Sequence, residues 1–134
     1  MDRAAFLKHV STGTLLVCTG CNLISCSSKD DPRPTVDFTL DLLLPINSAL
    51  QNIGGSISKD GVIVVKVSNT EFIALSQACT HAGTSVNYRT TQQDFHCPNH
   101  GSVFDKNGVV KTGPATTALK KYNAELTGDN LRVF

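Results

Sequence analysis

Charge of one sign, long apolar runs and spare metal ligands are all scarce in this chain of 134 residues. Lysine and arginine number twelve against eleven aspartate and glutamate residues, so the charge is nearly balanced. Balanced charge excludes a basic field for nucleic acid and a polybasic membrane patch. The length accommodates one domain with a modest core and leaves no room for a second, catalytic domain.

No long segment with an apolar period of 3.6 residues occurs from residue 35 onward, so long amphipathic helices are not expected there. The apolar run from Val10 to Ile24 is too short, and too rich in Thr, Ser and Gly, to predict a membrane span. It follows a short charged start, and residues 1–25 are therefore predicted to be an export signal.

The chain contains few cysteines, and they fall into two groups: Cys18, Cys21 and Cys26 near the N-terminus, then Cys79 and Cys97. If the N-terminal segment is cleaved or lipidated, only the last two remain as thiols. A metal would occupy both, so no structural disulfide is expected even in an oxidising compartment.

Two short stretches each offer one thiolate and one imidazole: Cys79-Thr80-His81-Ala82-Gly83 and Cys97-Pro98-Asn99-His100-Gly101-Ser102. Together they predict a metal site with four ligands. A zinc site is one alternative, because zinc also takes tetrahedral Cys and His ligands. Zinc fingers, however, pair Cys with Cys and then His with His, whereas each loop here carries one of each.

The order Cys-x-His followed by Cys-x-x-His resembles the Rieske family, in which two His replace two Cys on one of the two irons of a 2Fe-2S centre. The similarity extends to Gly101-Ser102, Phe104-Asp105, the turn Asn107-Gly108 and the run Gly113-Pro114-Ala115. These match the ligand loop, hairpin and proline loop of that family. The resemblance implies a Rieske-type fold and one 2Fe-2S cluster.

The resemblance also assigns roles within the site. It implies that Cys79 and Cys97 bind the buried iron, that His81 and His100 bind the other iron, and that the Ser102 hydroxyl donates to a bridging sulfide. Members in cytochrome bc-type complexes carry an additional disulfide and a Tyr, but in this chain Thr84, Asn99 and Phe104 occupy those positions. An intermediate potential below the bc-type members is therefore expected, within the family window of roughly −150 to +300 mV.

The fold class predicted from the pattern is all-β, with antiparallel sheets. Apolar residues alternate with polar ones from Val36 to Leu42, which is typical of a half-buried strand, and Lys59-Asp60-Gly61 predicts a hairpin turn. Leu50 to Ile53 predicts a short turn or strand, and two strands, Tyr122 to Leu126 and Leu131 to Phe134, are expected to complete the first sheet. The domain 35–134 is expected to hold a base formed by residues 35–76 and 115–134 and an inserted cluster-binding subdomain, 77–114.

The N-terminal segment carries two further resemblances. Residues 2–8 resemble a twin-arginine export signal, although Ala4 replaces its second Arg. Leu23-Ile24-Ser25-Cys26 resembles a bacterial lipobox, which predicts a lipid on Cys26 and an extended linker over residues 26–34. The alternative is an uncleaved N-terminal arm.

Two histidines remain outside the predicted site. His96 is expected to be a surface or packing residue facing away from Cys97, because neighbouring strand residues face opposite sides. His9 belongs to the predicted signal. This leaves no 2-His-1-carboxylate iron site, so the chain is not expected to be an oxygenase or an enzyme by itself.

Three functions remain open at this point. The first is an exported electron carrier in the bacterial periplasm or cell envelope, held to the membrane by lipidated Cys26 and exchanging one electron with a redox partner protein or a quinol. The second is a Rieske subunit of a larger quinol- or arsenite-oxidising complex. The third is a zinc-stabilised binding module. None of the three involves nucleic acid.

Overall fold

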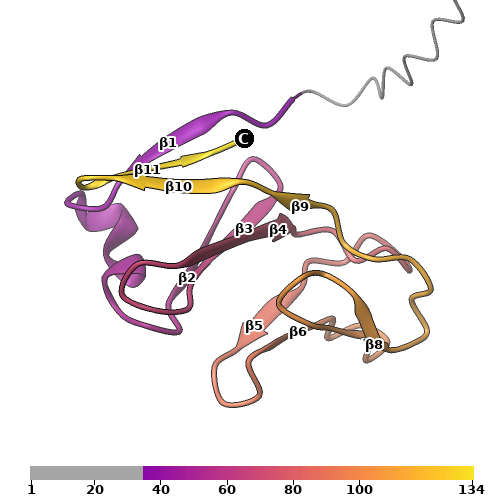
Figure 1. Cartoon of the computed structure of the whole chain (residues 1–134). Helices are drawn as coiled ribbons and strands as arrows, with labels where there is room; N and C mark the ends of the chain where they lie inside the picture. Colours follow the sequence, from indigo (N-terminus) through magenta and orange to yellow (C-terminus); the bar gives the residue numbers. More distant parts are fainter. Residues whose placement is uncertain (1–34) are drawn as a thin grey trace, which may run out of the picture. The chain divides into compact units, whose positions relative to one another are not determined.

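The structure is a computed structural model that describes residues 35–134. In this part of the chain, eleven short strands form three antiparallel sheets, and one 3₁₀ helix lies between the first and second strands in the sequence (Figure 1). The all-β prediction is confirmed. The predicted export signal, lipidated Cys26 and the predicted linker lie outside the described residues. Among residues 35–134, no helix has the length and apolar content needed to cross a bilayer.

Strands distant in sequence pair within each sheet. The first sheet has the order β1 (Phe38–Asp41), β11 (Asn130–Val133), β10 (Ala124–Thr127). The second has the order β2 (Ser56–Lys59), β3 (Val62–Lys66), β4 (Phe72–Ser76), β9 (Lys121–Tyr122). The third has the order β5 (Asn87–Arg89), β6 (Asp94–His96), β7 (Val103–Phe104), β8 (Val110–Thr112).

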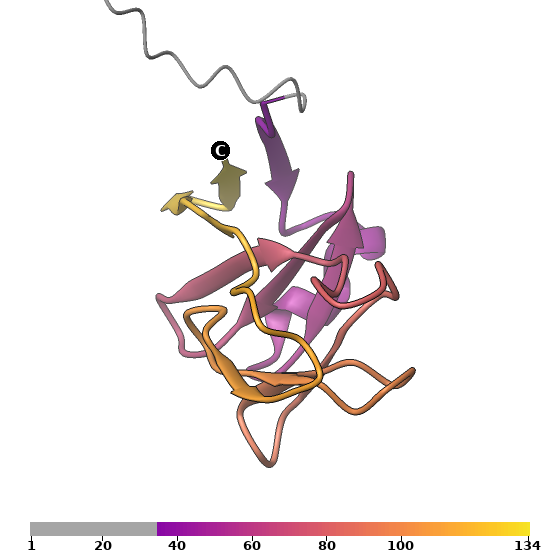
Figure 2. The ribbon, with the colours of Figure 1, turned by 90° about the vertical axis from the view of Figure 1, so that its right-hand side faces the viewer.

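The second sheet lies between the other two in both ribbon views (Figures 1 and 2), and its central strands β3 and β4 are buried on both faces. Alternate side chains of one strand point to opposite faces, so these strands supply two separate cores. One core contains Ile63, Val65, Ile73 and Leu75 together with residues of β6 and β7. The other contains Val62, Val64, Phe72 and Ala74 together with residues of β1 and β11.

The segment after β1 differs from its prediction. A 3₁₀ helix, Pro45–Gln51, replaces the turn or strand expected near Leu50. Proline fits the first turn of a helix because its fixed φ is already helical and its missing N–H would lack a partner there. The Leu50 side chain is fully buried in the second core, and the Asn47 side-chain amide donates to the Asp41 carbonyl oxygen over 2.7 Å. Tertiary burial therefore decides the conformation of this segment.

The predicted hairpin turn is confirmed. Lys59 pairs with Val62, which leaves Asp60 and Gly61 as the two loop residues, and both have positive φ angles, 50° and 76°. Two positive φ angles match the right-handed twist of the flanking strands and favour Asp-Gly at these positions.

The C-terminal strands complete two sheets, whereas the sequence predicted one. Tyr122 on β9 pairs with Ala74 of β4, whereas β10 and β11 join β1 in the first sheet. The chain passes from the second sheet to the first at Asn123, whose N–H and carbonyl oxygen form hydrogen bonds with the backbone of Phe134. The C-terminal segment thus contacts both the second and the first sheet.

Candidate metal centre

Two loops present the predicted ligands, and the same backbone hydrogen bonds close both. In the first ligand loop, residues 79–84, the N–H of Cys79 donates to Thr84 O (2.9 Å) and the N–H of Gly83 donates to Cys79 O (2.7 Å). In the second ligand loop, residues 97–102, the N–H of Cys97 donates to Ser102 O (2.8 Å) and the N–H of Gly101 donates to Cys97 O (3.0 Å). The same two backbone hydrogen bonds therefore close both loops, although the histidine follows the cysteine by two residues in the first loop and by three in the second.

A glycine stands four residues after the cysteine in each loop. Gly83 has φ 77° and Gly101 has φ 81°, which are left-handed conformations that cost other residues free energy. The repeated Cys-x-x-x-Gly spacing is a sequence signal for this shared loop geometry. The cysteines and histidines by themselves do not reveal this shared geometry.

The cysteines and histidines lie in different environments. Cys79 and Cys97 are free thiols with only 3% and 1% of their surface exposed, and both belong to the core shared by the second and third sheets. His81 and His100 are exposed, and their ring centroids lie 4.7 Å apart in an edge-to-face arrangement. The structure therefore places the two cysteines in one buried cluster and the two histidines against each other at the surface.

This division fits a binuclear centre. A Rieske centre needs two protein ligands at each iron, two Cys at one and two His at the other. The burial of the sulfur pair and the exposure of the imidazole pair match that requirement.

A third segment contacts both ligand loops. We call residues 113–118 the clasp loop. Thr80 in the first ligand loop donates from its hydroxyl to Thr117 O over 2.6 Å, and the Ala115 N–H donates to the hydroxyl oxygen of Ser102 over 3.0 Å. Ser102 is fully buried, and because its oxygen accepts this bond its own hydroxyl hydrogen remains able to donate elsewhere.

The remaining predicted residues also have defined places. Thr84 is half-buried and Asn99 is exposed, so these two positions bear a hydroxyl and an amide and cannot form a disulfide. Phe104 is fully buried in the same core as the cysteines. His96 is half-buried on β6 between Asn87 of β5 and Val103 of β7.

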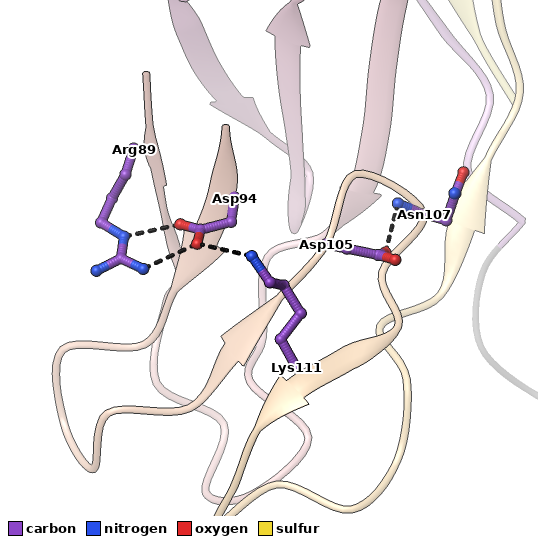
Figure 3. Close-up of polar contacts among 5 residues, drawn as sticks. All are labelled: Arg89, Asp94, Asp105, Asn107 and Lys111. Carbon is purple, nitrogen blue, oxygen red and sulfur yellow. Dashed lines mark hydrogen bonds and ion pairs between the residues drawn. The ribbon is translucent and has the colours of Figure 1, made fainter. Parts of the chain in front are cut away.

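An ion-pair group that sequence reasoning missed lies in the third sheet. Figure 3 shows Arg89 of β5 and Lys111 of β8 reaching the same carboxylate, Asp94 of β6. Arg89 makes two bonds of 2.7 and 2.9 Å, and Lys111 one of 3.5 Å. The Arg89 bonds lower the pKa of Asp94 despite its burial and raise the pKa of Arg89. No local sequence pattern indicates this group, because the strand register creates it.

Side-chain hydrogen bonds stabilise the turn between β7 and β8, which precedes the clasp loop in the sequence. The Asp105 carboxylate accepts hydrogen bonds from the backbone N–H groups of Asn107 (2.7 Å) and Val109 (2.9 Å), and Figure 3 shows the first of these. The predicted turn at Asn107-Gly108 is thus confirmed.

Comparison with known proteins agrees with the geometry. The model of the Rieske [2Fe-2S] domain matches residues 48–123, more than half of the chain. The cytochrome b6-f complex iron-sulfur subunits of Chlorobaculum thiosulfatiphilum and Synechococcus elongatus are 35% and 37% identical over 74 and 73 residues. These matches cover 55% and 54% of this chain but only 40% and 41% of the relatives, so the chain corresponds to well under two thirds of their length.

Solved structures give the same result. The plasma membrane Rieske protein PetC3 of the cyanobacterium Synechocystis PCC 6803 is 32% identical, with a TM-score of 0.53 over 60% of this chain and 84% of that one. A ferredoxin of carbazole 1,9a-dioxygenase from Nocardioides aromaticivorans, 23% identical with a TM-score of 0.54 over 63% and 90% of the two chains, shares the fold. The chain therefore belongs to the Rieske [2Fe-2S] domain family of electron carriers, whose domain binds one 2Fe-2S cluster.

Proposed function

We propose that this chain is a one-electron carrier in which Cys79 and Cys97 bind one iron of the cluster and His81 and His100 bind the other. The observation that carries the proposal is the pairing of two buried thiols with two exposed imidazoles 4.7 Å apart. When bound, the cluster supplies reversible one-electron chemistry in a window of roughly −150 to +300 mV.

The protein's own residues determine where that chemistry is accessible. Burial of Cys79 and Cys97 keeps water from competing with the sulfurs for the iron, and thiolates are the form in which cysteine binds iron. Neutral imidazoles at His81 and His100 remove two negative charges relative to four thiolates, which raises the potential. Their exposure gives a partner protein or a quinol a route to the centre.

We assign residues 77–114 to a cluster-binding subdomain inserted into a base formed by residues 35–76 and 115–134. The third sheet, β5 to β8, and both ligand loops fall inside this range, which supports the division. The clasp loop joins the two parts, because Gly113 and Pro114 fall at the end of the insert and Ala115 begins the second segment of the base.

Metal and sulfide analysis of the natively matured protein tests the ligand assignment. We expect iron, acid-labile sulfide and a Rieske-type paramagnetic signal after reduction, and we expect Cys97→Ser to abolish all three. The matched control is His96→Ala, which removes the neighbouring imidazole and should retain the cluster. Zinc in place of iron would contradict the proposal, and so would cluster loss in the His96 variant alone.

We further propose that the domain is exported and held at the outer face of a bacterial membrane, in the periplasm or cell envelope, by a lipid on Cys26. The lipobox-like Leu23-Ile24-Ser25-Cys26 and the polar, proline-containing residues that follow support this arrangement. A chain of nine residues extends at most about 30 Å, which lets the domain meet partners near the bilayer surface.

A second candidate is a subunit role in a larger quinol-oxidising or arsenite-oxidising complex. The names of the relatives, iron-sulfur subunits of the cytochrome b6-f complex, favour the quinol version. Purification from native membranes in mild detergent distinguishes the two candidates. A stable, stoichiometric complex with quinol oxidation activity would support the subunit role, and a monomer that shuttles electrons would support the carrier.

A further inference from the structure

A short apolar segment follows β1 on the surface of the domain, and we call its residues, 42–46, the apolar loop. The side chains of Leu43, Leu44 and Ile46 in this loop are 67%, 49% and 82% exposed. They are half of the six large apolar side chains that are exposed within residues 35–134. Exposed apolar surface concentrated in four consecutive residues is unfavourable in water and indicates an interaction site.

The N–H groups of the apolar loop find their hydrogen-bond acceptors within the domain. Leu42 donates to Asp129 O (2.9 Å), Leu43 to the Asp41 carboxylate (2.9 Å) and Leu44 to Asp41 O (3.3 Å). The next residue, Pro45, has no N–H group to satisfy.

Two carbonyl groups of the apolar loop are paired as well. Leu42 O accepts from the Gln51 side-chain amide over 3.1 Å, and Leu44 O accepts from the Asn47 N–H over 2.9 Å. Lipid chains offer no hydrogen-bond partners, so a segment that enters them must satisfy its backbone groups internally. A protein partner imposes no such condition, because it brings donors and acceptors of its own. The internal pairing therefore favours lipid as the occupant of this surface.

Charged side chains flank the apolar loop and are absent from it. Residues 42–58 contain no Asp, Glu, Lys or Arg, so no ion in this stretch would have to leave water. Lys59 lines the same cavity as Leu44 and Ile46. Lys66 donates from its ammonium to the carbonyl oxygen of the last residue of the 3₁₀ helix over 3.2 Å. Lysines beside an apolar segment can reach lipid phosphates while their aliphatic stems stay on apolar surface.

The apolar loop can reach the bilayer that would hold the lipid of Cys26. The proposed linker ends at residue 34, and β1 leads from there to the loop. An extended chain from residue 35 to residue 43 spans at most about 30 Å, which is also about the reach of the linker. The anchor and the loop can therefore meet one bilayer surface at the same time.

The apolar loop and the ligand loops lie on opposite sides of the second sheet. The 3₁₀ helix that follows the apolar loop buries Leu50 in the core shared with the first sheet, whereas Cys79 and Cys97 belong to the core on the other face. Figure 1 shows the helix at the left and the third sheet at the lower right. A bilayer contact through the apolar loop therefore leaves the imidazoles of His81 and His100 accessible from the aqueous side.

We propose that the apolar loop inserts into the surface of a lipid bilayer and so orients the domain on it, with Leu43, Leu44 and Ile46 at the boundary between headgroups and acyl chains. The proposal goes beyond the carrier function and uses the membrane attachment proposed above only to bring the domain to the bilayer. Removal of the three aliphatic side chains from water provides the driving force.

A single introduced tryptophan tests the insertion, because the chain contains no tryptophan of its own. The mature protein is incorporated into vesicles of phosphatidylethanolamine and phosphatidylglycerol, with or without bromine on the acyl chains, which quenches tryptophan inside the bilayer. We expect brominated lipid to lower the fluorescence of Ile46→Trp about twofold or more. The matched control is Val109→Trp, a position that is also exposed (54%) but lies in the turn before β8 on the far side of the second sheet. Its fluorescence should be the same in both kinds of vesicle.

Two results would overturn the proposal. The first is an absence of quenching at residue 46, or quenching that is equal at residues 46 and 109. The second is a blue shift of the Ile46→Trp emission that appears without vesicles and grows with protein concentration. That shift would show that a second copy of the chain, and not lipid, covers the apolar loop.

Mass spectrometry of the same samples separates this proposal from the lipid anchor. A mature protein without acyl chains would refute the anchor, and quenching at residue 46 in that protein would still support insertion of the apolar loop. A protein that carries acyl chains but shows no quenching at residue 46 would refute only the insertion.

Discussion

The Thr80 hydroxyl donates to the Thr117 carbonyl oxygen over 2.6 Å, although the two residues stand 37 positions apart. Together with the bond from Ala115 to Ser102, it ties the clasp loop to both ligand loops. Members of the family in cytochrome bc-type complexes have a disulfide between the two ligand loops, and this chain has Thr84 and Asn99 at those positions. Noncovalent bonds to a third loop therefore hold the two ligand loops here.

Removing the Thr80 hydroxyl should weaken the clasp. Thr80→Val keeps the side-chain shape and loses one hydrogen bond, whose net contribution is about 1 kcal/mol. We expect the variant to lose visible absorbance on mild heating about fivefold faster than the parent protein. Thr116→Val is the control, because within residues 35–134 its hydroxyl makes no side-chain hydrogen bond that the valine would remove. Equal bleaching rates in the two variants would argue against the clasp.

Substitutions at Ser102 and Phe104 should shift the reduction potential of the cluster in opposite directions. A hydrogen bond to a cluster sulfur stabilises the more negative, reduced state, so Ser102→Ala should lower the potential and Phe104→Tyr should raise it. A one-electron shift of about 59 mV corresponds to about 1.4 kcal/mol, close to the value of one good hydrogen bond. Protein-film voltammetry resolves shifts of several tens of millivolts. An unchanged or lower potential in Phe104→Tyr would contradict the expected position of the new hydroxyl.

Asp94 should stabilise the third sheet through its charge. Asp94→Asn keeps the shape but weakens two charge-assisted hydrogen bonds at a buried position, and such losses cost about 1–3 kcal/mol. Urea unfolding followed by far-ultraviolet circular dichroism measures the difference. Asp37→Asn is the matched control, because the Asp37–Arg132 pair is equally short at 2.7 Å but half-exposed, and exposed pairs contribute little.

The Asp94 effect should depend on pH in a defined direction. The bonds from Arg89 lower the folded-state pKa of Asp94 below its unfolded value, so the carboxylate adds stability above the unfolded pKa of about 4. That contribution is lost as the pH falls through the lower, folded-state pKa. We expect the stability gap between the parent and Asp94→Asn to stay constant from about pH 8 to pH 5 and to close only below about pH 4. A gap that closes near neutral pH would point to another titrating group.

The membrane attachment depends on one cysteine. Cys26→Ser should release the domain from membranes into the soluble fraction, because a bacterial lipoprotein acquires its acyl chains on this residue. Cys21→Ser, a change at the rival cysteine, is the control and should leave the protein attached. If the twin-arginine route exports the protein, Ala4→Arg should increase the amount of exported, cluster-loaded domain. Retention of Cys26→Ser on membranes would refute the lipid anchor.

Local chemistry determined much of this protein. The ligand pattern identified both loops and the family because a Rieske centre requires two Cys and two His ligands, and the sequence carries them at the spacing typical of that family. The turn at Asp60-Gly61 was predictable because a two-residue hairpin requires positive φ at both positions. The alternating strand near Phe38 was predictable because a half-buried strand has a period of two.

Tertiary structure decided the features that join distant segments. The 3₁₀ helix at Pro45–Gln51 forms where Leu50 enters the core, and the C-terminal segment changes sheet at Asn123 because of its pairing with Phe134. The bond between Thr80 and Thr117 and the Arg89–Asp94–Lys111 group likewise depend on which segments meet and in what register. Register between segments far apart in the chain is set by the packing of two cores against the shared strands β3 and β4, and no local pattern records it.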